Sequence, residues 1–194
     1  GSEMCIRDRL PDNYVKSVFP ISDGRIGVRS TVLLSLYDGA NYSNFPFNIH
    51  GEYPIVYNHI IPEQYIDTDK RLWMKERKSL RVFDLTTEQY IYNVDSLFLQ
   101  FGLKDRVEDL IIDSEKRYWF LTPGSSVYTY DTETHLLTFD SSEITDWNGI
   151  EELLLVDDYC VKIKDNVYEG TVPDGNAFDL ELNWSSRKPD NQAS

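Results

Sequence analysis

The sequence contains few residues in the arrangements that catalysis requires. Its histidines, His50, His59 and His135, form no His-Glu-x-x-His motif or other close pair, and no Gly-x-Ser-x-Gly elbow or phosphate-binding glycine loop occurs. Acidic neighbours such as Glu151-Glu152 are expected by chance among 33 acidic residues, and adjacent residues of a strand point to opposite faces. We therefore expect no catalytic residues, and a pair of carboxylates of the glycosidase type stays an alternative.

The cysteines do not form a recognisable metal site. Cys5 and Cys160 lie far apart, without a Cys-x-x-Cys pair or the histidine spacing of a zinc site. We expect no metal and no cofactor. Residues 1–9 are expected to be foreign to the natural sequence, because Gly1-Ser2 resembles a cleavage scar and the residues from Met4 resemble a translated sequencing adaptor.

Aromatic and cationic residues form the more informative set, because together they suit a sugar. An aromatic ring stacks on the C–H face of a pyranose, and guanidinium or ammonium groups pair with the carboxylate or sulfate of an anionic sugar. The candidate ligand-binding residues are Tyr53, Tyr57, His59, Lys75, Arg77 and Trp147. Two other interpretations stay open: residues 75–78 form a solvated hairpin turn, and the two tyrosines pack between structural elements.

The net charge limits the classes of partner. The chain of 194 residues has 19 Lys and Arg against 33 Asp and Glu, which gives a formal net charge of −14. A field of this sign repels phosphate backbones and anionic lipid headgroups. Neither nucleic acid nor a membrane surface is therefore an expected partner, whereas an oligosaccharide or another small ligand is.

An internal repeat predicts the elements that position these residues. Trp73 lies 46 residues after Gly27, and Trp119 lies 46 residues after Trp73. Each of the three follows a polar turn that contains an arginine. Each is followed 11 or 12 residues later by an aspartate that comes after an aromatic residue, namely Asp38, Asp84 and Asp131. A weaker fourth copy has Cys160 at the tryptophan position.

Each copy predicts four short strands with alternating apolar positions, separated by turns. Asp23-Gly24 and Asp38-Gly39 supply the positive φ that tight turns need. The strands are expected near 62–67, 71–76, 79–83 and 88–92 in the second copy, and near 108–113, 117–122, 126–130 and 135–139 in the third. Four strands in each repeat of about 46 residues predict an all-β fold, a β-propeller of four blades.

The predicted organisation places the candidate residues on one face. We expect a non-native or disordered lead at 1–12, blades at 13–48, 62–92, 108–140 and 151–182, and a polar tail at 183–194. In a propeller, the segments that join blades and the turns between second and third strands gather on the usual ligand face, and joining segments of this length are often functional. The four blades form either a partial arc of a larger propeller or a small closed ring.

The repeated motif resembles a known family. Leu72-Trp73-Met74 with Phe83-Asp84, and Tyr118-Trp119-Phe120 with Tyr130-Asp131, are similar to the two-component-regulator propeller repeat. The resemblance covers about residues 14–182, although glycine and cysteine replace the preferred tryptophan in the first and fourth copies. It implies an extracytoplasmic, periplasmic sensor domain of a hybrid two-component histidine kinase that controls glycan utilisation. Propellers of that family have more than four blades.

The leading interpretation is a non-catalytic, ligand-sensing propeller segment that responds to glycan fragments. The parent sensor is expected to act as a homodimer with two arrangements that differ in ligand affinity. The segment itself is expected to make no direct membrane contact. A protein–protein interaction propeller is the first alternative, and a propeller-type carbohydrate-active enzyme is the second.

Overall fold

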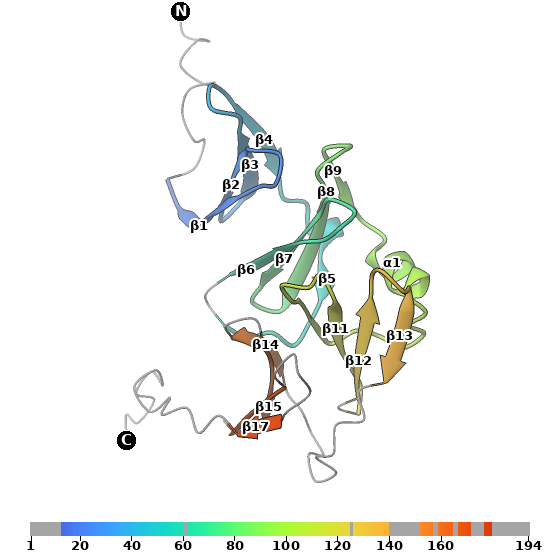
Figure 1. The fold of residues 1–194 in the computed structure, drawn as a ribbon. Helices are drawn as coiled ribbons and strands as arrows, with labels where there is room; N and C mark the ends of the chain where they lie inside the picture. The colour runs from blue at the N-terminus through green and yellow to red at the C-terminus, as the bar shows by residue number, and fades with distance from the viewer. Residues whose placement is uncertain are drawn as a thin grey trace, which may run out of the picture. The chain divides into compact units, whose positions relative to one another are not determined.

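A computed structural model describes most of the first 139 residues with their side chains and part of the remainder by its backbone (Figure 1). Side chains are described for 13–59 except Ile49, for 62–124 and for 126–139, and backbone alone for 152–156, 159–164, 167–171 and 177–179. The expected lead and tail and the candidate residue Trp147 lie outside the described residues. The chain forms two compact units, Gly1–Leu97 and Phe98–Ser194, which we describe separately.

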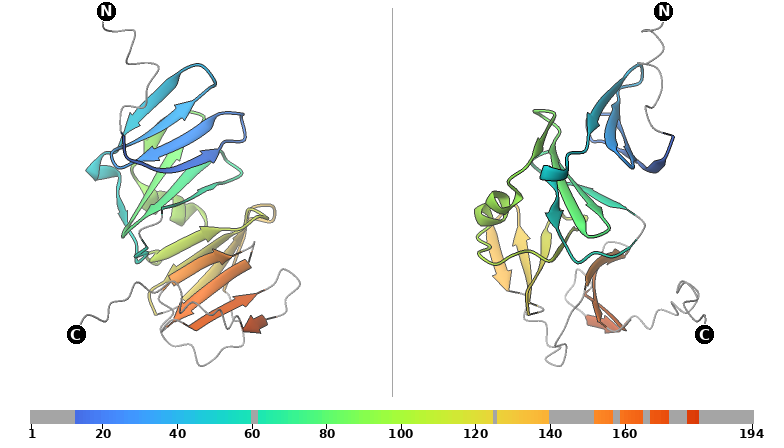
Figure 2. Two further views of the ribbon diagram at one scale, coloured as in Figure 1. Left: turned by 90° about the vertical axis from the view of Figure 1, so that its left-hand side faces the viewer. Right: turned by 180° about the vertical axis from the view of Figure 1, so that it is seen from behind.

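The first sheet is an antiparallel meander of four strands, visible as a twisted sheet in Figure 2. Its order is β1-β2-β3-β4. The strands are β1 (Val15–Pro20), β2 (Ile26–Ser30), β3 (Leu33–Tyr37) and β4 (Tyr42–Pro46). The two central strands are the most buried, as expected for strands paired on both sides.

The second sheet repeats this meander and adds one strand. Its strands are β6 (Glu63–Ile66), β7 (Arg71–Glu76), β8 (Ser79–Asp84) and β9 (Gln89–Ile91), which confirms the four strands predicted for this repeat. The short strand β5 (Tyr53–Pro54), which follows the 3₁₀ turn η2 (Ile49–Gly51), also pairs with β8. This strand was not predicted, because residues 49–61 were expected to form only a joining loop.

The second unit contains two further sheets. The third sheet consists of β10 (Asp109–Ile112), β11 (Tyr118–Thr122), β12 (Ser126–Asp131) and β13 (Leu136–Phe139). The fourth consists of β14 (Glu152–Val156), β15 (Tyr159–Lys164), β16 (Val167–Thr171) and β17 (Ala177–Asp179), so the weaker fourth repeat also forms a sheet. A short helix, α1 (Val94–Gln100), spans the boundary between the units along the chain.

The predicted all-β, propeller-type fold is therefore confirmed: each repeat forms one antiparallel sheet of four strands, to which β5 adds a fifth in the second repeat. The choice between an arc and a closed ring concerns the placement of the two units, and it stays a prediction.

The hydrophobic core of the first unit lies between its two sheets. The side chains of Phe19, Ile21, Leu34 and Leu36 meet those of Leu72, Met74, Phe83 and Leu85. The hydroxyl group of Tyr90 donates a hydrogen bond of 2.7 Å to the carbonyl oxygen of Phe45, which links the outer strands of the two sheets. Burial of an aliphatic or phenyl side chain contributes about 1.5–3 kcal/mol, so this face-to-face packing is the main source of stability in the unit.

An aromatic cluster covers one face of the third sheet. The ring of Phe101 lies 4.8 Å from that of Tyr118 and 4.7 Å from that of Tyr130, measured between centroids. The ring of Phe98 meets that of Phe120 edge to face at 5.7 Å. Aromatic packing thus attaches Phe98 and Phe101 to the third sheet, which belongs to the same unit.

A buried carboxylate organises the first turn of the second and third repeats. Asp67 accepts hydrogen bonds from Arg71 Nε at 2.6 Å and from Trp73 Nε1 at 2.8 Å. Asp113 accepts the corresponding bonds from Arg117 and Trp119, at 2.8 and 3.0 Å. The repeated tryptophans are therefore core residues whose indole N–H groups are satisfied.

The glycine at the tryptophan position of the first repeat has a packing reason. A Cβ atom at Gly27 would lie 2.3 Å from the ring of Phe19, the residue opposite it on β1. The phenyl ring therefore occupies the space that a side chain at this register would need. This explains why the first repeat has glycine where the second and third repeats have tryptophan.

The aspartates that end the motif shape the turn between the third and fourth strands. Oδ1 of Asp38 accepts hydrogen bonds from the backbone N–H groups of two following residues, and Asp131 makes the same pair of bonds to Glu133 and Thr134. These bonds form Asx turns. The backbone N–H groups of Thr134 and Glu133 lower the pKa of Asp131 because they stabilise its ionised form.

We expect Asp67→Asn to lower the free energy of unfolding by about 1–3 kcal/mol, because the buried carboxylate that binds Arg71 and Trp73 loses its charge. Urea denaturation followed by tryptophan fluorescence measures this. Asp69→Asn is the matched control, since Asp69 also pairs with Arg71 but has a side chain that is 69% exposed. Its effect is expected to stay below about 0.5 kcal/mol. Equal effects of the two substitutions would contradict the anchoring role of Asp67.

The turn at Asp131 predicts a dependence of stability on pH. Folding lowers the pKa of Asp131, so the ionised carboxylate adds to the free energy of unfolding at neutral pH. This contribution is lost as the pH falls below about 4 towards the pKa in the folded state. The difference in free energy of unfolding between the natural chain and Asp131→Asn should therefore shrink between pH 5 and pH 3. Glu133→Gln, which removes a charge from the same turn, is the control. A difference that is constant over this range would exclude the effect.

Candidate functional site

Four of the candidate residues meet at one end of the second sheet. The segment that leads from β5 towards β6 runs along the turn between β7 and β8: the backbone N–H of Lys78 donates to the carbonyl of Tyr57 at 2.6 Å, and that of Ile55 donates to Lys78 at 3.3 Å. Tyr57, His59, Lys75 and Arg77 are therefore neighbours in space, although they come from two separate parts of the chain.

Lys75 is buried, and the interpretation of residues 75–78 as a solvated turn is wrong for it. Its side chain is 0% exposed, and its Nζ lies 4.3 Å from the ring centroid of Tyr57 and 3.6 Å from Oε2 of Glu63. Burial removes water from the ammonium group, and the attraction of the aromatic face and of the carboxylate offsets this cost in free energy. Only Arg77 and Lys78 form the turn, because β7 continues to Glu76.

The two tyrosines are buried as the packing interpretation expects. Tyr57 is 1% exposed and Tyr53 is 8% exposed. Tyr53 stands opposite Leu80 in the short pairing of β5 with β8. Their rings pack within the first unit in this structure, so a role in ligand binding stays a prediction for both.

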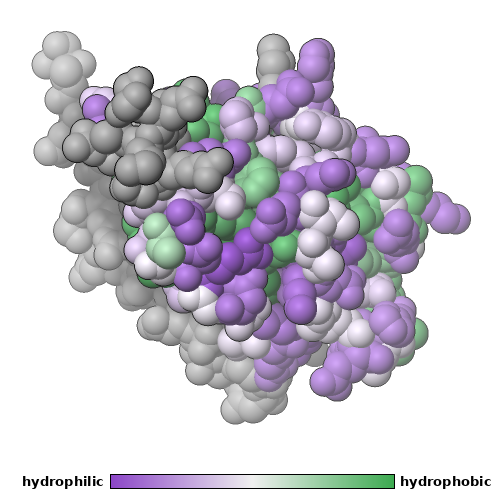
Figure 3. Space-filling view, turned by 90° about the horizontal axis from the view of Figure 1, so that it is seen from above, coloured by the Kyte–Doolittle hydropathy of each residue, from purple (hydrophilic) through white to green (hydrophobic). Residues whose placement is uncertain are grey.

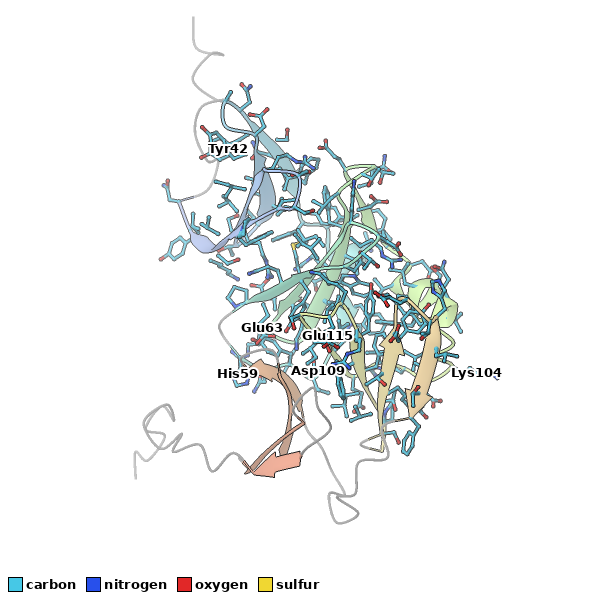
Figure 4. All side chains as sticks on the ribbon, viewed as in Figure 1. Tyr42, His59, Glu63, Lys104, Asp109 and Glu115 are labelled. Carbon is cyan, nitrogen blue, oxygen red and sulfur yellow. The ribbon has the colours of Figure 1, made fainter. Side chains whose placement is uncertain are left out.

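His59 and Arg77 are exposed to solvent, and their role in ligand binding stays a prediction. The ring of His59 lies edge-on to that of Tyr57 at 5.2 Å, and Arg77 Nε donates to Oδ1 of Asn58 at 3.2 Å. Figure 4 shows His59 and Glu63 on the segment that enters β6. Together these side chains offer an imidazole, a guanidinium and an amide to a polar ligand.

A group of charged residues that the sequence analysis did not select lies between the two sheets of the first unit. We call it the ionic cluster, and its members are Lys16, Arg29, Glu52, Glu76 and Arg81. Glu76 occupies the middle, since Oε1 pairs with Lys16 while Oε2 lies 3.9 Å from Arg29 Nη2 and 3.7 Å from Arg81 Nη1.

Arg29 joins the sheets through main-chain hydrogen bonds. Its Nη1 donates to the carbonyl oxygen of Glu63 at 2.8 Å, and its Nη2 donates to that of Lys75 at 3.1 Å. Burial, together with the nearby positive charge of Arg81, lowers the pKa of the Arg29 guanidinium to about 10. The group stays charged at neutral pH and holds strands β6 and β7 against the first sheet.

Arg81 occupies the outer side of the cluster. Its guanidinium carbon lies 4.5 Å from the ring centroid of Phe47, and its Nη2 pairs with Glu52. With three cations and two carboxylates, the ionic cluster has one formal positive charge in excess, in a chain whose net charge is −14. An excess of this sign favours a negatively charged ligand.

One signal for these residues was present in the sequence. Arg29 and Lys75 are 46 residues apart, so they take the same register in successive repeats, two residues after Gly27 and Trp73. Residues two positions apart in a strand point to the same face, so a cation two positions after a core residue indicates a buried charge. The sequence offers no comparable signal for the pairing of Glu52 with Arg81.

No protein-family model matches the sequence, and no curated protein matches it. Solved structures do match. The extracellular domain assigned to the hybrid two-component system BT4673 from B. thetaiotaomicron matches with a TM-score of 0.52 and 16% identity, over 91% of this chain and 23% of that chain.

Two other structures match at lower TM-scores. The corresponding domain of BT3049 from B. thetaiotaomicron gives a TM-score of 0.49 at 13% identity, over 88% of this chain and 25% of that chain. Virginiamycin B lyase from Staphylococcus aureus gives 0.47 at 9% identity, over 92% of this chain and 59% of the lyase. At such identities the BT4673 match establishes the fold alone. This chain spans about a quarter of the length of that protein domain.

Two properties of the described residues complete the description of the site. The surface seen in Figure 3 is mainly hydrophilic, with small apolar areas between the polar ones. Among the residues that the structure describes, no helix has the length and apolar character of a membrane span, and no three His, Cys, Asp or Glu side chains are grouped to hold a metal ion.

We expect Arg29→Lys to lower the free energy of unfolding by about 1.5–3 kcal/mol, because a lysine cannot reach both carbonyl oxygens that the guanidinium satisfies. Arg25→Lys is the matched control. Arg25 also bridges the two sheets, through Glu88 at 2.6 Å, but its side chain is 20% exposed and the expected cost is below about 1 kcal/mol. Urea denaturation measures both, and a reversed order would contradict the role of Arg29.

Proposed function

We propose that this chain is part of the extracytoplasmic, ligand-sensing propeller of a hybrid two-component system that responds to glycan fragments. The observation that carries the proposal is the shared fold over 91% of the chain with the extracellular domain of BT4673, a protein assigned to the hybrid two-component systems. The resemblance of the repeat around Trp73 and Trp119 to the two-component-regulator repeat is a separate line of support. The proposed compartment is the periplasm.

The proposed ligand site is the end of the second sheet at which His59, Asn58 and Arg77 are exposed. Their groups donate and accept hydrogen bonds in the way that sugar hydroxyls require. The backbone hydrogen bonds of Tyr57 and Ile55 to Lys78 connect this site to the turn between β7 and β8. A ligand that binds here therefore acts on a segment that is attached to the blade.

The proposed mechanism is a population shift without chemistry. A sensor that exists in two arrangements moves towards the one that binds the ligand better, by no more than the difference in binding free energy. The proposed partner is a second copy of the parent sensor. The protein-interaction propeller and the carbohydrate-active enzyme are the competing functions.

The test is isothermal titration calorimetry of the 194-residue chain against a panel of neutral and acidic oligosaccharides, combined with assays for hydrolysis and elimination. We expect heat of binding without turnover. His59→Ala and Arg77→Gln are each expected to weaken binding about tenfold, the effect of losing a hydrogen bond of about 1.4 kcal/mol. Lys70→Gln, at the opposite end of β7, is the control that should not change binding.

Each other outcome points to a competing function. Turnover of any oligosaccharide would contradict the proposal of a non-catalytic sensor and support a carbohydrate-active enzyme. The absence of both heat and turnover across the panel would contradict glycan sensing and favour protein interaction.

A further inference from the structure

Arg81 has a guanidinium group that is held flat and buried. The residue is 8% exposed and stands opposite Met74 in the pairing of β7 with β8, and its guanidinium carbon lies over the ring of Phe47, 4.5 Å from the centroid. A guanidinium group over an aromatic face keeps its N–H groups available for hydrogen bonds in its own plane. The edge that contains Nε and Nη2 is therefore preorganised for a group with two acceptor oxygens.

That edge is only partly occupied by the protein. Nη2 pairs with Oε1 of Glu52, whereas Nε is buried and has no hydrogen-bond partner. A buried donor without a partner costs about 1–3 kcal/mol. A carboxylate or sulfate group that bridges Nε and Nη2 would remove this cost, because its two oxygens match the spacing of the two donors.

Glu52 is the replaceable partner in this arrangement. Its side chain is 44% exposed, and it lies outside regular structure, between the 3₁₀ turn that ends at Gly51 and strand β5. Glu76, the other carboxylate near Arg81, is 16% exposed, belongs to β7 and is shared with Lys16 and Arg29. An incoming anion is therefore expected to displace Glu52 rather than Glu76.

The charges of the ionic cluster favour the same exchange. Its three cations and two carboxylates leave one positive charge in excess. Displacement of Glu52 leaves Glu76 as the one carboxylate of the cluster beside three cations, so an anion that takes the place of Glu52 restores the negative charge that the cluster loses. In a partly buried site the attraction is screened less by salt than it is at the surface.

We propose that Arg81 binds a carboxylate or sulfate-ester group of an acidic sugar, which displaces Glu52 from the Nε and Nη2 edge of the guanidinium. This inference deepens the proposed function, since it names the chemical class of the sensed ligand. Glu52 directly precedes β5, so its displacement acts on the segment that leads to His59.

The experiment titrates the chain calorimetrically with inorganic sulfate, glucuronate, glucose 6-sulfate and glucose at constant ionic strength. We expect binding of sulfate and of at least one acidic sugar, and none of glucose. If glucuronate binds more tightly than glucose 6-sulfate, the site prefers a carboxylate, and the reverse order indicates a sulfate ester. Equal binding of glucose and both acidic sugars would overturn the inference.

Substitutions in the pair make the test specific. Glu52→Gln removes the internal competitor and is expected to bind sulfate and the acidic sugar about tenfold more tightly than the natural chain does. Arg81→Lys loses the two-donor edge and is expected to bind about tenfold more weakly. Lys70→Gln, an exposed cation at the far end of β7, is the control with no expected effect.

Near-ultraviolet circular dichroism establishes that each variant is folded. Because Glu52 is exposed, Glu52→Gln keeps the test decisive even where Arg81→Lys does not fold. An unchanged affinity for sulfate in Glu52→Gln overturns the inference. Binding of neutral oligosaccharides without binding of the acidic probes overturns the inference but leaves glycan sensing intact. Binding of sulfate alone, with no sugar in either panel, overturns the inference of an acidic sugar and also contradicts glycan sensing.

Discussion

The register of strand β7 depends on one buried carboxylate. Because Asp67 binds the side chains of both Arg71 and Trp73, the strand begins with the indole ring turned to a defined face. Side chains two residues apart share a face, so Lys75 must point the same way as Trp73. A slip of one residue would turn Leu72 and Met74 away from the first sheet and remove half of the core between the sheets.

The same register brings charge into the interior of the first unit. Arg29 follows Gly27 at the spacing at which Lys75 follows Trp73, and both cations are buried. A buried charge is tolerated only where it is paired and hydrogen-bonded. The guanidinium of Arg29 is hydrogen-bonded to carbonyl oxygens of the second sheet. The ammonium group of Lys75 is paired with Glu63 and lies over the ring of Tyr57. The apolar core therefore ends in a charged region at the end of the unit where the proposed ligand site lies.

Local patterns were sufficient to predict the four strands of the second and third repeats, although not the short strand β5. The alternation in Arg71–Glu76 and Ser79–Asp84, and the Asp-based turns that follow, involve residues that are close in the sequence. Lys75 was misjudged because four consecutive charged residues resemble a solvated turn, although only the last two of them form it. The pairing of Glu52 with Arg81 was not predictable, because the two residues come from different elements whose meeting depends on how β5 joins β8.

The sequence by itself determined the repeat, the four-stranded blades and the face to which each residue of a strand points. The physical reason is that strand alternation and turn hydrogen bonds act over a few residues and depend little on the rest of the chain. Only the tertiary structure decided which charges meet, how deeply Arg29 and Lys75 are buried and which edge of Arg81 lacks a partner. Burial and charge pairing depend on the packing of one sheet against the next, and such contacts join residues as far apart in the sequence as Arg25 and Glu88, which are 63 positions apart.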